Sequence, residues 1–211
     1  MARVSRALVA ASAELARRDP AMAAMVEQVG PCALPLRRSP AGHFASLART
    51  ICYQQLAGRA AATIHGRFVA LFPDAAPSPA AVLALPDTAL RGVGLSGSKV
   101  ASLRDLAWHV ESGEIRPATM ARRADEEVVR TLTVVRGIGR WTAEMFLMFQ
   151  LGRLDVWPVD DFGVRNGYAR LYGLDPMPTA RQLEPHGDAF RPYRSVAAWY
   201  CWRAVDDVTP G

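Results

Sequence analysis

Apolar residues recur at three- and four-residue intervals along almost the whole chain, and polar residues fill the positions between them. This spacing puts the apolar side chains on one face of an α-helix. No stretch shows strict alternation over enough residues to indicate a β-strand. The pattern predicts an all-α protein, with helices over residues 5–18, 21–29, 44–53, 58–72, 79–84, 87–91, 98–112, 125–134, 141–151, 162–172 and 195–206.

Proline and glycine mark the links between these helices, and no link has the low complexity of a flexible interdomain linker. The chain has 211 residues, of which 50% are hydrophobic, so it can bury a sizeable core in one domain or two small lobes. It contains no apolar run of about 18 residues and no signal-peptide cleavage pattern. We therefore expect a cytoplasmic, intracellular protein that does not bind a membrane.

The chain is basic, with a net charge of +5 and a pI near 9.6. This balance fits a polyanionic partner such as nucleic acid, although many ordinary domains are as basic. Lys99 is the only lysine, so chemistry that needs a lysine amine has one candidate. Cys32, Cys52 and Cys201 are odd in number and none has a cysteine or histidine at metal-ligand spacing. They are expected to be reduced core thiols, and a zinc or iron–sulfur site is not expected.

A tight turn is predicted where Gly137 and Gly139 flank Ile138, between two helical patterns. Glycine permits backbone conformations that are closed to other residues, and the next helix presents unpaired N–H groups at the positive end of its dipole. Such a turn can bind a DNA phosphate through main-chain donors, with Ile138 anchored between the helices. Taken alone, Gly-x-Gly favours a plain helix-to-helix turn with a glycine cap.

The sequence after the turn makes the pattern more specific. Residues 137–143 read Gly-Ile-Gly-Arg-Trp-Thr-Ala, and residues 155–161 read Asp-Val-Trp-Pro-Val-Asp-Asp. Together they closely resemble the helix-hairpin-helix (HhH-GPD) DNA glycosylase superfamily, in its 3-methyladenine DNA glycosylase II branch. The likeness covers roughly residues 40–205 and includes no counterpart of the N-terminal β domain that some members carry. It implies one compact helical unit over residues 1–211, with lobes of roughly 45–120 and 1–44 plus 121–211 and a cleft between them.

The resemblance implies a monofunctional DNA glycosylase that excises alkylated purines from duplex DNA by hydrolysing the N-glycosidic bond, and so initiates base excision repair. Breaking this bond builds positive charge on the sugar, which a fixed carboxylate stabilises. The second aspartate of the pair, Asp161, matches the family's catalytic carboxylate, whereas Asp160 is interpreted as structural. The residues themselves favour another role for either aspartate, as the N-cap of the helix that starts near Phe162.

Position 141 distinguishes two reaction types. Relatives that also cut the strand carry a lysine there, whose amine forms a Schiff base with the sugar. This chain has Trp141, so lyase activity is not expected. The resemblance also implies a base pocket lined by Trp141, Trp202 and Met145, where some members carry a tyrosine at the last position. The alternative is that the tryptophans are core residues.

The resemblance implies DNA contacts from the hairpin, from a loop that inserts into the duplex and from a further motif: Gly137, Ile138, Gly139, Arg140 and Thr142; Gln54, Gln55 and Leu56; Ser96 and Lys99. Either Gln55 or Leu56 would fill the gap that the flipped base leaves. A simpler alternative has Gln54 capping a helix and Leu56 in the core. Lys99 fits a phosphate contact or a solvated surface charge equally well.

No cofactor is expected to be required. The family's hairpin often holds a monovalent cation, Na or K, through main-chain oxygens that match Thr133, Val135 and Ile138. The expected partner is double-stranded DNA with a damaged base, bound by a monomer. Two other functions stay open: a glycosylase for oxidised or deaminated bases, and a non-catalytic helix-hairpin-helix module that binds DNA.

Overall fold

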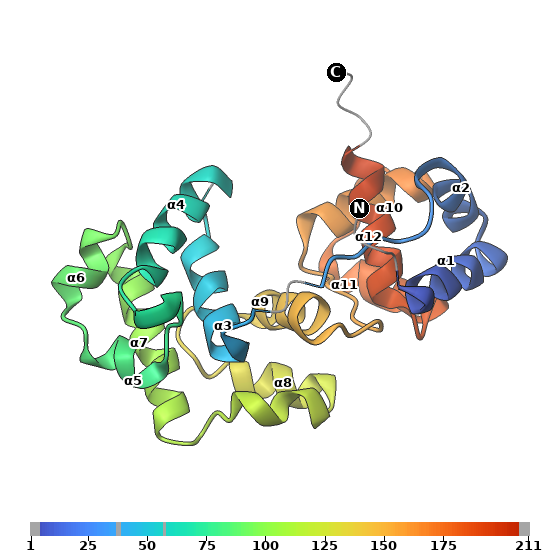
Figure 1. The fold of residues 1–211 in the computed structure, drawn as a ribbon. Helices are drawn as coiled ribbons and strands as arrows, with labels where there is room; N and C mark the ends of the chain where they lie inside the picture. The colour runs from blue at the N-terminus through green and yellow to red at the C-terminus, as the bar shows by residue number, and fades with distance from the viewer. Residues whose placement is uncertain (1–4, 37–38, 57, 207–211) are drawn as a thin grey trace. The chain divides into compact units, whose positions relative to one another are not determined.

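The computed structural model describes residues 5–36, 39–56 and 58–206, and these residues form helices and loops without a strand (Figure 1). The expected all-α class is therefore confirmed. The α-helices are α1 (Arg6–Arg18), α2 (Pro20–Val29), α3 (Gly42–Tyr53), α4 (Gly58–Val69), α5 (Pro79–Ala84), α6 (Asp87–Gly92), α7 (Gly97–Glu111), α8 (Asp125–Leu132), α9 (Arg140–Met145), α10 (Phe162–Tyr172), α11 (Ala180–Leu183) and α12 (Arg194–Asp206).

Helices with strong periodicity lie close to where the sequence predicts them, and 162–172 and 79–84 match α10 and α5 fully. The predicted helix 141–151 differs, because α9 passes at Phe146 into a π-helix, η3 (Phe146–Leu151). The short 3₁₀ segments η1 (Pro73–Ala75), η2 (Pro117–Arg122) and η4 (Glu184–Phe190), and the four-residue α11, are absent from the prediction. Segments this short do not contain enough turns to show a periodic apolar face.

The chain divides into two compact units. Residues Arg37–Leu151 form the central unit, and residues Met1–Leu36 with Gly152–Gly211 form the terminal unit. These bounds differ from the expected lobes, since segments 37–44 and 121–151 belong with 45–120. The physical reason is packing: α8 contacts α9, and η3, which continues from α9, contacts α3. The hairpin and the predicted inserting loop are therefore parts of the same unit.

In the central unit, α7 is the helix on which several others pack. Its N-cap Ser96 accepts a hydrogen bond from the Lys99 main-chain N–H at 3.3 Å, which satisfies a donor of the first turn. One face of α7 buries Val100, Leu103 and Leu106, and α5, α3 and α6 contact the helix. Such burial contributes about 1.5–3 kcal/mol for each large side chain.

In the terminal unit, α10 and α12 lie side by side at very short range (Figure 1). Gly167 on α10 makes this approach possible, because a Cβ there would lie 1.9 Å from the main-chain oxygen of Cys201 on α12. Asp161 caps the start of α10, and Gly173 ends it in the left-handed conformation with φ 62°. The close contact at Gly167 and the cap at Asp161 therefore fix where the N-terminus of α10 lies relative to α12.

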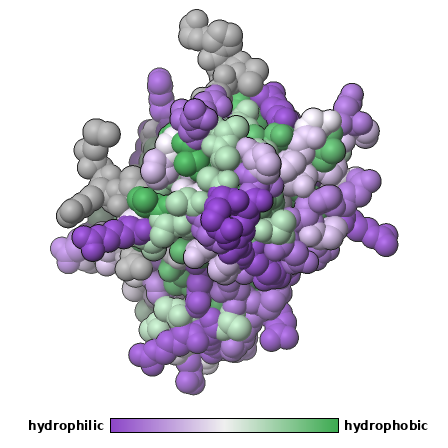
Figure 2. All heavy atoms as spheres, turned by 90° about the vertical axis from the view of Figure 1, so that its right-hand side faces the viewer, coloured by the Kyte–Doolittle hydropathy of each residue, from purple (hydrophilic) through white to green (hydrophobic). Residues whose placement is uncertain are grey.

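All three cysteines are free and buried, which confirms them as core residues. Burial raises the pKa of the Cys32 thiol to about 12, and burial does the same for Cys52 against the nearby positive charges. Among the described residues, no group of three or more His, Cys, Asp or Glu side chains is placed to hold a metal ion. No helix in the described part of the chain is long and apolar enough to cross a membrane. Figure 2 shows a face on which hydrophilic side chains predominate and apolar ones are scattered between them.

Gly167→Ala should destabilise the protein strongly. The added Cβ has a backbone carbonyl in its way, which cannot rotate aside as a side chain can, so we expect a loss of about 3 kcal/mol or more in the free energy of unfolding. Gly66→Ala in α4 is the matched control, because a Cβ at Gly66 meets nothing within 4 Å and helix propensity should add about 0.5–1 kcal/mol. Urea unfolding of both variants measures the difference. Equal stability of the two variants would contradict the proposed close contact.

Candidate functional site

The turn between α8 and α9 has the form of a hairpin whose apolar residues point inward. Val135 and Ile138 are buried, with Ile138 only 3% exposed, so the predicted anchoring of Ile138 is confirmed. Gly137 has φ +77°, and a Cβ there would lie 2.6 Å from the Ser102 hydroxyl oxygen. Both the backbone conformation and the contact require glycine at this position.

Gly139 differs from Gly137. Its backbone is extended, with φ −88° and ψ 175°, and a Cβ there would meet nothing within 4 Å. The prediction that both glycines adopt conformations closed to other residues is therefore wrong for Gly139. The first-turn N–H groups of α9 begin directly after it, and helix geometry gives these groups no partner within the helix. Gly139 leaves the main chain open to approach at this point.

Arg140 joins the two helices of the hairpin. Its guanidinium forms ion pairs with Glu126 in the first turn of α8 and, at 3.1 Å, with Glu144 in α9. Hydrogen bonding to Glu126 raises the pKa of Arg140 above its ordinary value. The positive charge of Arg140, which was expected to contact DNA, is thus largely neutralised by glutamates of the protein. Thr142, in the same turn of α9, is buried, and it lines the edge of a cavity.

The predicted inserting loop directly follows α3. Gln54 is the C-cap, as the simpler alternative expected, and its side-chain amide also donates a 2.8 Å hydrogen bond to the main-chain oxygen of Gly137. Gln55 has φ +55°, an uncommon conformation for a residue other than glycine. Leu56 is 37% exposed, so its assignment to the core is wrong. The loop is therefore tied to the hairpin through Gln54, while Leu56 faces solvent.

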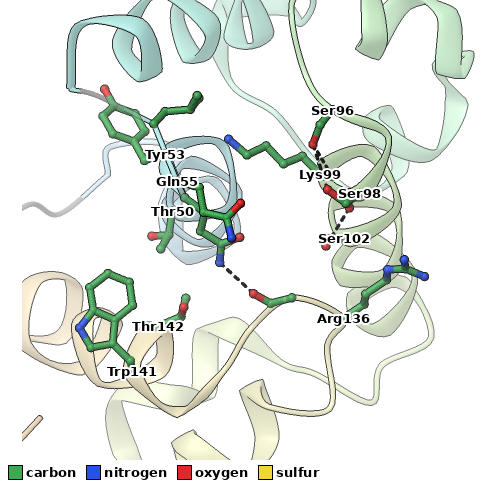
Figure 3. A pocket seen from close by; sticks show the side chains of 13 residues that line it. Thr50, Tyr53, Gln55, Ser96, Ser98, Lys99, Ser102, Arg136, Trp141 and Thr142 are labelled. Atoms are coloured by element: carbon green, nitrogen blue, oxygen red, sulfur yellow. Dashed lines mark hydrogen bonds between the residues drawn. The ribbon is translucent and has the colours of Figure 1, made fainter. Parts of the chain in front are cut away.

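One face of α7 contacts both the loop and the hairpin (Figure 3). Lys99, Ser102 and Asp105 are three residues apart, which places them on the same side of the helix. The Lys99 amine donates to the main-chain oxygen of Cys52 in the last turn of α3 at 2.8 Å. Ser102 lies against Gly137, and the Asp105 carboxylate accepts a hydrogen bond from the Arg136 main-chain N–H at 2.7 Å.

Lys99 is consequently held against the protein by a hydrogen bond and is only partly exposed to solvent. Its side chain extends toward the end of α3 (Figure 3), and partial burial lowers the pKa of its amine. A cation at the C-terminal end of α3 also interacts favourably with that helix's dipole. The bond to Cys52 was not expected from the sequence, since it joins residues 47 positions apart and depends on a main-chain acceptor.

Two cavities adjoin these residues within the central unit. A polar one of about 930 Å³ lies among the end of α3, α7 and the hairpin, and Lys99, Ser96, Gln55, Leu56 and Thr142 are among its lining residues (Figure 3). The second, which we call the aromatic cavity, has about 610 Å³ and is lined by Ser39, Pro40, Ser46, Arg49, Thr50, Tyr53, His65, Trp141, Met145, Phe146, Phe149 and Gln150. Trp141 lines both cavities and is 40% exposed. The structure thus brings together Trp141 and Met145, two of the three predicted pocket residues.

Asp161 and Trp202, the remaining predicted residues, form a pair within the terminal unit. Asp161 Oδ1 accepts hydrogen bonds from the Val164 main-chain N–H and from the Trp202 indole Nε1, both at 2.9 Å. Asp161 is therefore the N-cap of α10, so the cap interpretation is confirmed for it, whereas Asp160 is exposed and precedes the cap. Gly163 leaves room for the pair, because a Cβ there would lie 2.8 Å from the Trp202 ring.

Known proteins with similar sequences and folds agree on the family. Residues 48–192 match the family described as HhH-GPD superfamily base excision DNA repair protein. DNA-3-methyladenine glycosylase 1 of Schizosaccharomyces pombe is 38% identical over 162 residues, which are 76% of this chain and 71% of that protein. The chain belongs to the HhH-GPD superfamily.

Solved structures of the HhH-GPD superfamily match most of the chain. The S. pombe 3-methyladenine DNA glycosylase Mag1, solved in complex with abasic DNA, has a TM-score of 0.85 at 33% identity and covers 95% of this chain and 99% of its own. A DNA-3-methyladenine glycosidase from Bacillus halodurans has a TM-score of 0.81 at 38% identity, covering 90% of this chain and 86% of its own. The all-helical glycosylase fold is thus shown for most of the chain rather than for the hairpin alone.

Gln54→Ala should loosen the loop and the hairpin together. Losing one partly exposed hydrogen bond should cost about 0.5–1.5 kcal/mol, so the protein stays folded. We expect faster amide hydrogen exchange at residues 54–56 and 135–139 than in the unsubstituted protein. Gln55→Asn is the control, because asparagine tolerates positive φ and the bond to Gly137 is kept. Unchanged exchange at the hairpin in Gln54→Ala would show that the bond does not couple the two segments.

Proposed function

We propose that this protein is a monofunctional DNA glycosylase that excises alkylated purines, such as 3-methyladenine, from duplex DNA and so initiates base excision repair. The observation that carries the proposal is the Asp161 carboxylate, held by an indole N–H and a helix N-terminus. The similarity to 3-methyladenine glycosylases over most of the chain supports the substrate class, and the complex of Mag1 with abasic DNA supports double-stranded DNA as partner.

The reaction requires a charge next to the sugar at a fixed position. As the bond between C1′ and the base nitrogen breaks, its electron pair leaves with the base and positive charge develops on the sugar. We assign Asp161 to stabilise that charge, after which water adds its oxygen to C1′ and loses a proton. The Val164 main-chain N–H and the Trp202 indole N–H donate to the same oxygen, Oδ1, which orients the carboxylate before the reaction begins.

A flipped purine needs flat apolar walls. We assign this role to Trp141 and Met145, which line the aromatic cavity of the central unit, and we assign Trp202, in the terminal unit, to hold the Asp161 carboxylate. Electron-rich indoles favour cationic alkylated bases by stacking and cation–π attraction. The exposed side chain of Leu56, beside Gln55 in its strained turn, supports a role for this loop in filling the gap in the duplex.

We assign the hairpin to bind a DNA phosphate. The open space at Gly139 and the donors of the first turn of α9, over Arg140 and Thr142, support binding through main-chain N–H groups. Ser96 and Lys99 line the adjoining polar cavity, where they are assigned to the DNA backbone as well. A monovalent cation would be held by the main-chain oxygens of Thr133, Val135 and Ile138. Val135 O already accepts the Ile138 N–H at 3.0 Å, and a carbonyl oxygen has a second lone pair for an ion. Such an ion would neutralise phosphate charge locally.

Asp161→Asn should abolish base release and leave DNA binding nearly intact. Asparagine is as good an N-cap as aspartate, so α10 should keep its start, while the loss of charge should slow release about 100-fold or more. Asp160→Asn is the matched control, since it removes the same charge from the exposed neighbour. Single-turnover release of 3-methyladenine from a methylated duplex measures the effect. Release by Asp161→Asn at the normal rate would refute the assignment.

The product should be an abasic site in an intact strand. A Schiff base needs a lysine amine at the sugar, but position 141 is a tryptophan and the sole lysine, Lys99, is bonded to the Cys52 carbonyl. We therefore expect strand breaks only after treatment with alkali or heat, and no covalent protein–DNA adduct on borohydride reduction. Breaks without such treatment would indicate the alternative, a bifunctional glycosylase for oxidised bases.

A further inference from the structure

Arg165 lies one turn after Asp161 in α10, within the terminal unit. Its main-chain N–H donates to the Asp161 main-chain oxygen at 3.1 Å. Residues four apart on a helix are neighbours, with about 5–6 Å between their Cβ atoms. The Arg165 side chain therefore starts close to the carboxylate to which the chemistry is assigned.

The side chain of Arg165 is half-buried and has no partner among the described residues. Its Nε is buried without a hydrogen bond. Its guanidinium forms no ion pair there, either with Asp161 or with the exposed Asp160. A buried donor that makes no bond costs stability, so its retention needs an explanation outside the folded chain itself.

Three other side chains of the described chain contain a buried polar atom without a partner, but each also forms an interaction through another atom. They are Asp125, Glu144 and Arg203. Arg165 differs from them, because all of its donors and its whole charge remain available to a bound molecule. An arginine in this state fits an anionic ligand.

Other arginines of the terminal unit do not share this state. Arg191 and Arg194 form ion pairs with Asp155, at 3.0 and 2.8 Å. Arg170, in the last turn of α10, is exposed, so keeping it unpaired costs little. Arg165 combines partial burial with the lack of a partner, and it does so beside Asp161.

The start of α10 is open to a large molecule. Phe162, which directly follows Asp161, is 63% exposed, and Asp160 is exposed as well. The terminal unit therefore leaves this end of the helix uncovered around Asp161. A DNA strand can approach the carboxylate here.

The proposed reaction itself requires a positive charge near Asp161. The carboxylate acts at C1′ of the flipped sugar, and that sugar is joined to a phosphate on its 5′ side and another on its 3′ side. Carboxylate and phosphates repel one another when the strand is in place. The two donors to Asp161 Oδ1 are an indole and a main-chain N–H, which are neutral and do not offset this repulsion. A guanidinium one turn away offsets it and donates to phosphate oxygens.

Resting on the glycosylase function proposed above, we infer that Arg165 binds a phosphate that flanks the flipped nucleotide in the damaged strand. Arg165 thereby holds the sugar next to Asp161 and takes no part in breaking the bond. The stability lost through its unpaired Nε in the free protein is the cost of keeping a guanidinium ready at this position.

The test measures binding to a duplex with a tetrahydrofuran analogue of an abasic site, which requires no base release. Arg165→Gln should weaken this binding about 10- to 100-fold, the loss expected for a charge-assisted hydrogen bond. The slope of log affinity against log salt concentration should become shallower by about 0.9, the value for one phosphate contact.

Neutral methylphosphonates, placed at one flanking phosphate at a time, locate the contact. At the phosphate that Arg165 binds, the replacement should weaken binding by the unsubstituted protein about 10-fold or more. It should have little further effect in Arg165→Gln, because the contact is already lost. Arg170→Gln is the matched control, since it removes the same charge from the exposed far end of the same helix. Its effect should multiply with that of the methylphosphonate at either position.

Arg165→Met distinguishes phosphate binding from a structural role. Methionine keeps an unbranched apolar stem and removes the buried unpaired Nε, so the midpoint of thermal unfolding without DNA should stay the same or rise. Affinity for the abasic-site duplex should fall as it does in Arg165→Gln. A lower midpoint with an unchanged salt slope would show a structural role and overturn the inference. The methionine variant also provides the same comparison with methylphosphonates if Arg165→Gln does not fold.

The outcomes for the inference and for the proposed function are separate. If Arg165→Gln and the methylphosphonates act independently at both flanking positions, the phosphate contact is overturned, whereas release of 3-methyladenine by the unsubstituted protein still supports the glycosylase. If the two changes are coupled but the unsubstituted protein releases no base from any alkylated duplex, the phosphate contact stands and the proposed function is contradicted.

Discussion

Three side chains on one face of α7 hold the end of α3 and the glycine hairpin at a fixed separation. Lys99 bonds the last turn of α3, Ser102 lies on Gly137, and Asp105 bonds the main chain of Arg136. Gln54 closes the arrangement by joining the loop directly to Gly137. Each bond contributes about 0.5–1.5 kcal/mol, but together they leave the loop and the hairpin little freedom to move apart. The function proposed for the hairpin and the loop has both of them act on the same duplex, which requires this fixed spacing.

At the start of α10, one side chain likewise joins two segments of the chain. Asp161 accepts the N–H of Val164 as a helix cap and the indole N–H of Trp202 from α12. Gly167 brings α12 close enough for this, and Gly163 leaves space for the ring. In the proposed reaction, the carboxylate that caps α10 also carries the chemistry, so the capping interaction holds the charge in place.

Much of this could be predicted from the sequence, where the signal is local or periodic. The long amphipathic helices, the turn around Ile138 and a cap at the start of α10 all follow from the spacing of apolar residues, glycines and aspartates. The bonds from Lys99 to Cys52 and from Gln54 to Gly137 could not be found in this way, because each depends on a main-chain acceptor that any residue type provides.

The lobe boundaries were not predictable for a related reason, since they depend on which helix η3 packs against rather than on any break in composition. Gly139 shows where the glycine pattern of the sequence predicts too much. Its role was predicted from conformation, whereas its backbone is one that any residue can adopt. The glycine pattern was thus informative about the turn without indicating which glycine the turn requires.

The hydrogen bond from Lys99 to the Cys52 carbonyl also affects how the protein can be regulated. With one lysine in the chain, every other basic side chain that could attract DNA is an arginine or a histidine. Arginine keeps its charge across the physiological pH range and is not a target of acetylation. The one lysine amine would first have to release the Cys52 carbonyl, so lysine acetylation can change little of the positive charge of this protein.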